Sequence, residues 1–362
     1  MDPLASHSTD NRARDDYVEH LARGAGMVPA PLASVVMVAY NHADFLAEAI
    51  ESVLGQEAEF PFELLIGDDC STDSTMAVAL DFQGRFPGRI RCFSGRNNVG
   101  QHRNYARLVA ECRGEFIAYC DGDDYWSARG KLQRQVDYLR EREHVGAVHT
   151  DFDRILFRDG RWRRNRSFLA SRFKGGGVPE GSIFERLLSG NFIQTCTLCM
   201  RANLVRDFMT SGLLKPEYSV NDWPLFLYIA ARADIDFLPG STAVYRKSVG
   251  SLTNSGMAAR AKFVAGYIPM IEDFCALHGV ADDVRNAALA VHYRQLASFS
   301  ALAGNLRMFE SARAWLNENE SDFTKSWRGR ALPVLTRASI GRRLLVLVQE
   351  AREQVRDRWS FR

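Results

Sequence analysis

The stretch that decides the fold is Phe116-Ile-Ala-Tyr-Cys-Asp-Gly-Asp-Asp-Tyr-Trp126. Its first four residues form an apolar run typical of a buried strand, and three carboxylates follow almost at once. Carboxylates this close repel one another unless a cation or hydrogen-bond donors neutralise them. Such oxygen ligands suit Mg²⁺ or Mn²⁺, and the phosphate oxygens of a nucleotide diphosphate would complete the shell. An acidic turn capping the helix that begins near Lys131 explains the same residues without a ligand, so the motif alone leaves both interpretations open.

The surrounding sequence alternates short apolar runs with amphipathic stretches. Strands are predicted over residues 34–40, 62–66, 90–93 and 116–120, and helices over 44–54, 74–82 and 104–111. This alternation predicts a mostly parallel α/β sheet with helices on both faces, in which ligands bind beyond the carboxyl ends of the strands. Polar residues follow all four strands, at Tyr40-Asn41, Asp68-Asp69, Asn97-Asn98 and Asp121 to Asp124. Four such strand ends favour a binding site over packing alone.

Two related classes of nucleotide-binding protein are disfavoured by the segment after the first strand. A dinucleotide-binding domain needs GxGxxG there, and a nucleotidyltransferase needs a glycine-rich basic loop. The chain instead has Asn41-His-Ala-Asp-Phe45 at this place. The absence of glycines predicts that phosphates are neutralised by a metal ion.

Composition and charge limit the number of domains, the partners and the cellular location that we expect. The chain has 362 residues, 46% of them hydrophobic and 25% charged, which is enough for one large domain and a smaller one. A formal net charge of +2 gives no reason to expect a nucleic acid partner, although residues 325–362 alone carry a net charge of +7. The seven cysteines, including the Cys196-Thr-Leu-Cys199 pair, are expected to be reduced core residues. With no signal pattern and no run long enough to span a membrane, the expected location is cytoplasmic.

The ordered motifs resemble a known family, the GT-A glycosyltransferases of family 2. The resemblance covers roughly residues 34–252 and is carried by Val35-Val-Met-Val-Ala-Tyr-Asn41, Asp68-Asp-Cys-Ser-Thr-Asp73, Asn97-Asn-Val-Gly100 and Gly114-Glu-Phe-Ile-Ala-Tyr-Cys-Asp-Gly-Asp-Asp124. It implies a Rossmann-like nucleotide-diphospho-sugar transferase fold, followed here by a C-terminal α-helical region. It also implies an inverting transfer from a nucleotide-diphosphate sugar, with a lean to UDP, to a hydroxyl acceptor, with Mn²⁺ or Mg²⁺ as cofactor.

Carried over residue by residue, the resemblance implies three groups of site residues. The nucleotide-sugar site consists of Ala39, Tyr40, Asn41, Asp69, Asn98, Asp121, Gly122 and Arg246. Asp123 and Asp124 are implied as metal ligands, and Asp222 as the catalytic base. The segment Asn221-Asp-Trp-Pro224 is also a good helix start, and one acid can serve as both cap and base. Ser248 departs from the family, because many relatives carry His at that position, and Arg246 or Lys247 could supply positive charge instead.

The acceptor and the partners are less constrained. A basic excursion over residues 151–191, with a turn at Asp159-Gly160, fits either an anionic acceptor or a solvated hairpin. The acceptor could be a saccharide, a lipid-linked molecule or a peptide. The protein could also form a homo-oligomer, or it could bind a nucleotide sugar without catalysing transfer. The expected setting is cell-surface polysaccharide or glycolipid synthesis, by analogy. For a peptide acceptor, the helical region would be the docking surface.

Three segments are predicted along the chain. Residues 1–33 form a flexible N-terminal arm with at most a short helix, and residues 34–256 form the GT-A domain. Residues 257–362 form a helical C-terminal domain with a basic amphipathic tail. That tail either contacts the inner membrane face as a peripheral element or packs on the protein or a second subunit.

Overall fold

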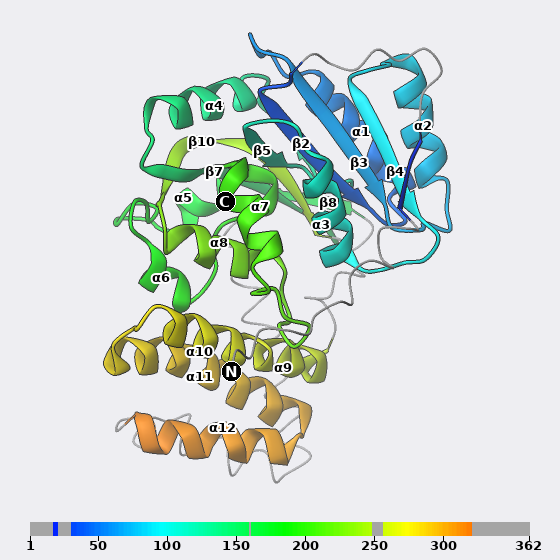
Figure 1. Cartoon of the computed structure of the whole chain (residues 1–362). Helices are drawn as coiled ribbons and strands as arrows, with labels where there is room; N and C mark the ends of the chain where they lie inside the picture. The colour runs from blue at the N-terminus through cyan, green and yellow to red at the C-terminus, as the bar shows by residue number, and fades with distance from the viewer. Residues whose placement is uncertain (1–16, 21–29, 159–160, 248–255, 321–362) are drawn as a thin grey trace, which may run out of the picture. The chain divides into compact units, whose positions relative to one another are not determined.

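The structure is a computed structural model that describes residues 17–20, 30–158, 161–247 and 256–320 (Figure 1). The chain forms two compact units. The first consists of Met1–Phe152, Ile193–Thr210 and Asp236–Tyr245, and the second of Asp153–Phe192, Ser211–Ile235 and Arg246–Arg362. The predictions about Ser248 and the basic tail lie outside the described residues.

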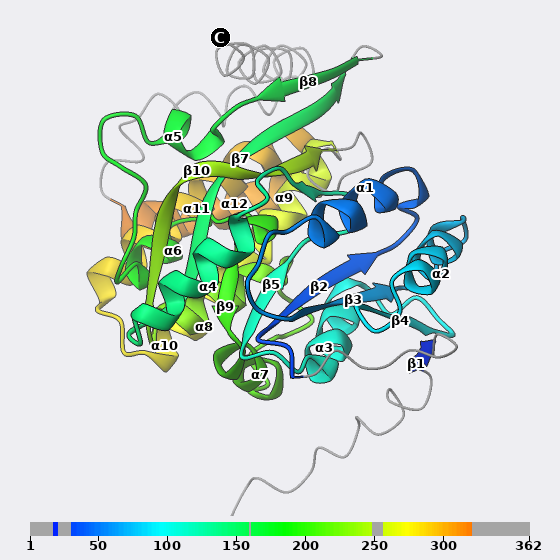
Figure 2. The same ribbon diagram turned by 90° about the horizontal axis from the view of Figure 1, so that it is seen from above.

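The parallel part of the sheet lies in the first unit. It is made of β2 (Ala33–Ala39), β3 (Phe62–Asp68), β4 (Ile90–Gly95) and β5 (Phe116–Tyr119). Helices connect these strands: α1 (Ala43–Leu54), α2 (Thr75–Arg85) and α3 (Gln101–Glu111). β2 pairs in parallel with both β3 and β5, and β3 with β4 (Figures 1 and 2). The predicted alternation is confirmed, and it brings the carboxyl ends of β2, β3 and β5 to one edge of the sheet.

The remaining strands make the sheet mixed rather than parallel. The strand order is β1-β4-β3-β2-β5-β9-β7-β10-β6, with β8 paired to β7. The added strands are β6 (Tyr125–Trp126), β7 (Val145–Arg158), β8 (Arg161–Asn165), β9 (Cys199–Arg201) and β10 (Asp234–Lys247). β9 pairs antiparallel with both β5 and β7. Helices α4 (Lys131–Glu141) and α7 (Ala202–Thr210) complete the first unit.

Cysteines occupy the core of this sheet, as the sequence predicted. Cys196 lies in a short 3-10 turn, η1 (Thr195–Thr197), and Cys199 begins β9; both side chains are fully buried. The seven cysteines form no disulfide. The interpretation of the CxxC pair as core residues is therefore confirmed.

The N-terminal segment contains a strand that the sequence analysis did not predict. β1 (Tyr17–His20) pairs antiparallel with β4, so the expectation of at most a short helix is wrong for these four residues. Tyr17 stacks on Phe93 with ring centroids 5.5 Å apart, and Glu19 accepts a hydrogen bond of 2.7 Å from Arg91 Nε. These contacts form only beside β4, so a four-residue polar segment shows little sign of them in its own sequence.

The second unit is mainly helical. Its helices are α5 (Phe168–Arg172), α6 (Phe184–Leu188), α8 (Asp222–Ala230), α9 (Met257–Ala265), α10 (Tyr267–Leu277), α11 (Asp282–Ala303) and α12 (Leu306–Asn319). The predicted helical region after residue 257 is confirmed for the described residues (Figure 1). Within the described part of the chain, no helix combines the length and apolarity needed to cross a bilayer.

Candidate functional site

The loop after β2 is fastened to the loop after β3. Asn41 has a left-handed backbone (φ 55°), and its Oδ1 accepts a hydrogen bond of 2.8 Å from the Thr72 amide. The Asn41 amide donates in turn to Ser71 Oγ at 2.9 Å. Ala39 is buried at the end of β2, whereas the Tyr40 side chain next to it is 45% exposed. The loops after β2 and β3 are therefore joined by hydrogen bonds into one rim at the carboxyl ends of the strands, with the exposed Tyr40 ring beside it.

Asp69 joins this rim to the loop after β4. Its two carboxylate oxygens accept hydrogen bonds of 2.8 Å from the amides of Val99 and Gly100. Gly100 has φ 84°, a conformation that favours glycine, and its amide also donates to Asn98 Oδ1 at 3.2 Å. Asp69 is 6% exposed, while Asn98 is exposed. The structure thus brings Asp69 and Asn98 together, and Asp69 supports the loop as well as facing the predicted site.

The three acids after β5 lie in three different environments. Asp121 accepts a short hydrogen bond from the Tyr105 hydroxyl. The Asp123 side chain is 32% exposed, with Oδ2 4.0 Å from His42 Nε2. Asp124 is 1% exposed, and burial, followed by the negative charge of Asp124, raises the pKa of the Cys196 thiol. The three acids therefore differ in partner and in exposure.

His42 is a site residue that the sequence analysis quoted but did not assign. Its Nδ1 is buried and has no hydrogen-bond partner among the residues that the structure describes. A Cβ on Gly122 would lie 3.0 Å from this Nδ1, so the glycine allows the imidazole to lie against the acidic turn. The sequence signal for it is a histidine in the loop just after one strand, combined with acidic residues just after the neighbouring strand.

A buried lysine with a lowered pKa follows the acidic turn in the sequence. Lys131 is 1% exposed, and its Nζ lies 4.1 Å from the centre of the Trp126 ring and donates to Gln135 Oε1 at 2.7 Å. Burial lowers the pKa of Lys131 to about 8. Burial, followed by the negative charge of Asp124 and Asp123, raises the pKa of Tyr245. A buried environment of this kind has a low effective dielectric constant, which strengthens the electrostatic interactions of the groups within it.

These residues fit a divalent cation in part. Asp123 Oδ2 and His42 Nε2 are an oxygen and a nitrogen ligand close enough to share one ion, and nucleotide phosphates would supply further oxygens. No group of three or more His, Cys, Asp or Glu side chains placed to hold a metal is found among the described residues. The donor set therefore suits an ion that arrives with its nucleotide rather than one held in a complete protein cage.

Asp222 and Arg246 belong to the second unit. Asp222 is the first residue of α8, and its Oδ1 accepts from the Trp223 amide at 2.8 Å. The Trp223 ring contacts Tyr267 of α10 and His292 of α11, with centroids 5.0 and 5.6 Å apart, and its Nε1 donates to the Leu187 carbonyl at 3.0 Å. The pKa of Tyr267 is raised by burial and then by the charge of Asp222. Aromatic packing from the C-terminal helices therefore fixes the start of α8 and the acid on it.

Arg246, in contrast, is only 7% exposed on β10. Its side chain is thus largely withdrawn from solvent in this structure. The predicted roles of Asp222 in proton transfer and of Arg246 in donor binding both stay predictions.

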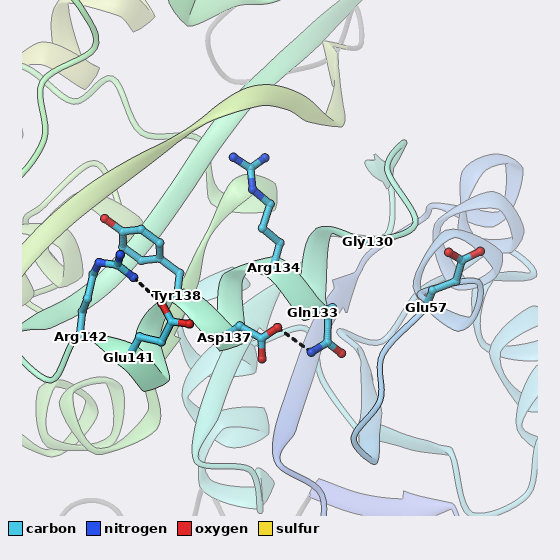
Figure 3. Close-up of a pocket in the computed structure, with 8 residues that line it drawn as sticks. All are labelled: Glu57, Gly130, Gln133, Arg134, Asp137, Tyr138, Glu141 and Arg142. Carbon is cyan, nitrogen blue, oxygen red and sulfur yellow. Dashed lines mark hydrogen bonds and ion pairs between the residues drawn. The ribbon is translucent and has the colours of Figure 1, made fainter.

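A separate hollow of about 460 Å³ lies along the outer side of α4 in the first unit (Figure 3). Its lining includes Arg134, Asp137, Tyr138 and Arg142. Many of its polar groups are already engaged: Gln133 donates to Asp137 at 2.7 Å and Arg134 to the Pro239 carbonyl at 2.9 Å. None of the predicted site residues lines it, so the strand-end rim is the candidate site.

Comparison with known proteins identifies the family. A family model described as Glycosyl transferase family 2 matches residues 34–205. An uncharacterized protein of Mycobacterium tuberculosis is 31% identical over 240 residues, which is 64% of this chain and 63% of that protein. "Putative glycosyltransferase EpsE" of Bacillus subtilis is 33% identical over 201 residues, which is 56% of this chain and 67% of EpsE. The chain belongs to glycosyltransferase family 2.

A solved structure supports the fold. The mannosyltransferase PcManGT from Pyrobaculum calidifontis, solved in complex with GDP-Man and Mn²⁺, matches with a TM-score of 0.50 and 16% identity over 92% of each chain. The predicted family and GT-A fold are therefore confirmed. The chain spans only 63% of the length of the mycobacterial relative.

Proposed function

We propose that this protein is a metal-dependent inverting glycosyltransferase that moves a sugar from a nucleotide-diphosphate sugar, with UDP as the expected nucleotide, to a hydroxyl acceptor in cell-surface polysaccharide synthesis. The observation that carries the proposal is the rim at the carboxyl ends of β2, β3 and β5. There, Asp69 and Asp121 are held by specific donors, while Asp123 stays open to solvent beside His42.

The donor nucleotide is proposed to bind along this rim. A carboxylate accepts hydrogen bonds and cannot donate them, so Asp69 suits the ring N–H of a uracil or thymine base. Each of its oxygens has a second lone pair beyond the one used by the Val99 or Gly100 amide. Tyr40 offers an exposed ring face for stacking. Asp121, oriented by the Tyr105 hydroxyl, is the proposed acid facing the ribose.

A divalent ion is proposed to be held by Asp123, with His42 as its neighbour. When bound, the ion would supply positive charge for the diphosphate leaving group. Asp124, the other predicted ligand, is turned into the core, so we expect Asp123 to contribute more to ion affinity.

Asp222 is proposed to be the general base. Its carboxylate would take the proton from the acceptor hydroxyl as that oxygen attacks the anomeric carbon. A single displacement of this kind inverts the configuration at the anomeric carbon. The aromatic packing around Trp223 would keep the acid in place during the reaction.

The test is a ligand-binding panel on the full chain with two site variants and one control. UDP-, dTDP- and GDP-sugars, each with and without Mn²⁺, are compared in thermal unfolding of the wild type, Asp123→Asn and Asp222→Asn. Asp81→Asn is the matched control, because Asp81 is an exposed acid on α2. A ligand at 100 times its Kd stabilises a protein by about 2.7 kcal/mol, which a melting curve resolves.

We expect metal-dependent stabilisation by one base class that Asp123→Asn loses and Asp222→Asn keeps. Release of the nucleotide should fall by roughly 10²- to 10⁴-fold in Asp222→Asn. If the wild type binds a sugar nucleotide but releases no nucleotide with any acceptor tested, the protein is better explained as a catalytically silent nucleotide-sugar binder. No stabilisation by any sugar nucleotide would remove the donor site from consideration.

A further inference from the structure

The hairpin of β7 and β8 carries an exposed aromatic pair. Phe157 and Trp162 are cross-strand partners, and their ring centroids lie 5.2 Å apart. Both are far more exposed than aromatic side chains of a core, at 42% and 44%. The two strands run side by side as a two-stranded ribbon (Figure 2). Two adjacent aromatic rings, tilted by 60° to each other, form a compact apolar surface open to solvent on this ribbon.

Arginines flank this pair along the ribbon: Arg161 and Arg163 are the strand neighbours of Trp162 and therefore lie on the opposite face from the two rings. β8 has the sequence Arg-Trp-Arg-Arg-Asn, and its first four residues are exposed. Residues 153–174 contain eight Arg or Lys against two Asp. Of the two acids, Asp153 is described, and it accepts from Arg164 Nε at 2.7 Å and from the Ser167 amide at 3.0 Å. The hairpin therefore presents a strong positive charge together with its aromatic rings.

The base of the hairpin is well anchored within the second unit. Asp153 ties β7 to β8 and to the chain just before α5 through the two bonds above. The Arg154 guanidinium lies 4.7 Å from the centre of the Phe168 ring at the start of α5. Leu169, the next residue, is fully buried. A fixed base means that the exposed end loses little conformational freedom on binding a partner.

Two partners share the required negative charge: a membrane with anionic headgroups and an acidic polysaccharide. Sugar hydroxyls both donate and accept hydrogen bonds, so saccharide sites need acceptor side chains as well as donors. The side chains of the exposed described residues Phe157, Arg161, Trp162 and Arg163 carry guanidinium and indole N–H groups and apolar rings, none of which is a hydrogen-bond acceptor. Phosphate headgroups accept only, and aromatic rings favour the membrane interface. This chemistry favours the membrane.

We propose that the β7–β8 hairpin docks the protein end-on on an anionic lipid surface, with Phe157 and Trp162 entering the interface from one face of the ribbon and Arg161 and Arg163 contacting headgroup phosphates from the other. This inference does not depend on the proposed catalytic activity. It is also separate from the predicted role of the basic C-terminal segment, because it concerns different residues.

The experiment is co-sedimentation of the full chain with vesicles of phosphatidylcholine alone or of phosphatidylcholine mixed with phosphatidylglycerol. The double variants Phe157→Ala/Trp162→Ala and Arg161→Gln/Arg163→Gln are compared with the wild type. We expect binding to the anionic vesicles only, weakened about ten-fold or more in the aromatic variant. Each arginine removed should weaken binding about five-fold, and added salt should weaken the wild type similarly.

Matched controls remove comparable side chains elsewhere. Leu80→Ala on α2 and Leu306→Ala on α12 remove exposed apolar residues that are 38% and 49% exposed. Arg129→Gln removes an exposed arginine of the first unit. All three should sediment like the wild type. Far-UV circular dichroism and melting curves confirm that each variant is folded, and the arginine variant tests the idea even if the aromatic variant fails to fold.

A second readout places Trp162 in the bilayer. Lipids brominated near the headgroup should quench part of the tryptophan fluorescence of the wild type and less of it in Trp162→Phe. Wild-type sedimentation by folded variants of both kinds would overturn the proposal and assign vesicle binding to another part of the chain. Equal binding to neutral vesicles, or binding to an acidic polysaccharide but not to vesicles, would overturn it as well.

Discussion

The burial of Lys131 predicts how the free energy of unfolding of the protein depends on pH. The ordinary pKa of a lysine is 10.5, and burial lowers that of Lys131 to about 8. Below pH 8 both folded and unfolded chains hold the proton, so the folded state bears the whole cost of a buried charge. Between pH 8 and 10.5 the unfolded chain holds the proton and the folded chain does not, so stability rises with pH across this window.

The size of this effect follows from the difference in pKa. At 1.36 kcal/mol per pH unit, the difference corresponds to about 3 kcal/mol in the free energy of unfolding. Lys131→Met removes the titration, but it also removes the 2.7 Å bond to Gln135 Oε1, which costs about 1–3 kcal/mol. The variant should therefore have a stability close to that of the wild type at pH 7. Relative to the variant, the wild type should gain about 2–3 kcal/mol between pH 7 and pH 10.5.

The assay is urea unfolding of both proteins at a series of pH values. Taking the difference between them cancels the titration of buried tyrosines and cysteines, whose raised pKa values make stability fall at high pH. Lys262→Met, which removes an exposed lysine on α9, is the control and should follow the wild type. Parallel profiles for Lys131→Met and the wild type would refute the idea that Lys131 is held at a cost in its charged form.

Three further variants test the rim directly. Gly122→Ala places a Cβ 3.0 Å from His42 Nδ1, so it should lower the melting temperature and weaken Mn²⁺ binding, which electron paramagnetic resonance measures. The control Gly84→Ala, whose added Cβ meets nothing within 4 Å, should have neither effect. His42→Gln should weaken Mn²⁺ binding in the presence of nucleotide without loss of stability, and unchanged affinity would exclude His42 from the ion site. Asp69→Asn should destabilise the protein by about 1.5–3 kcal/mol in urea unfolding, because one of its two amide bonds loses a charged acceptor; an unchanged midpoint would count against that support.

The parallel half of the fold was predictable because its signals are local and strong. The strands predicted over residues 34–40 and 116–120 correspond to β2 at Ala33–Ala39 and β5 at Phe116–Tyr119. Fully buried parallel strands appear in a sequence as uninterrupted apolar runs, and the helices between them keep one apolar face. A hairpin around the Asp159-Gly160 turn was one of the two interpretations of the basic residues 151–191, and β7 does pair with β8.

What the sequence did not reveal depends on contacts between distant segments. β1 is stabilised by pairing with β4, and the Asp222 segment by rings from α10 and α11. His42 gains its place beside Asp123 only because Gly122 leaves room 80 residues further along the chain. No periodicity marks such positions, since each is one residue whose role is set by a partner elsewhere.

The acidic turn shows why residue type alone does not assign a ligand. A bond of 3.0 Å from the Asp124 amide to the Asp121 carbonyl closes the turn, and Asp124 is then buried near Cys196 while Asp123 faces solvent. Three crowded carboxylates need a cation or hydrogen-bond donors to neutralise them. The fold supplies a donor for Asp121 in the Tyr105 hydroxyl and withdraws the Asp124 side chain from solvent. Asp123 has a side chain that is 32% exposed and lies beside His42, so its replacement should separate ion binding from folding more cleanly than replacement of Asp124, which is buried, or of Asp121, which is bound by Tyr105.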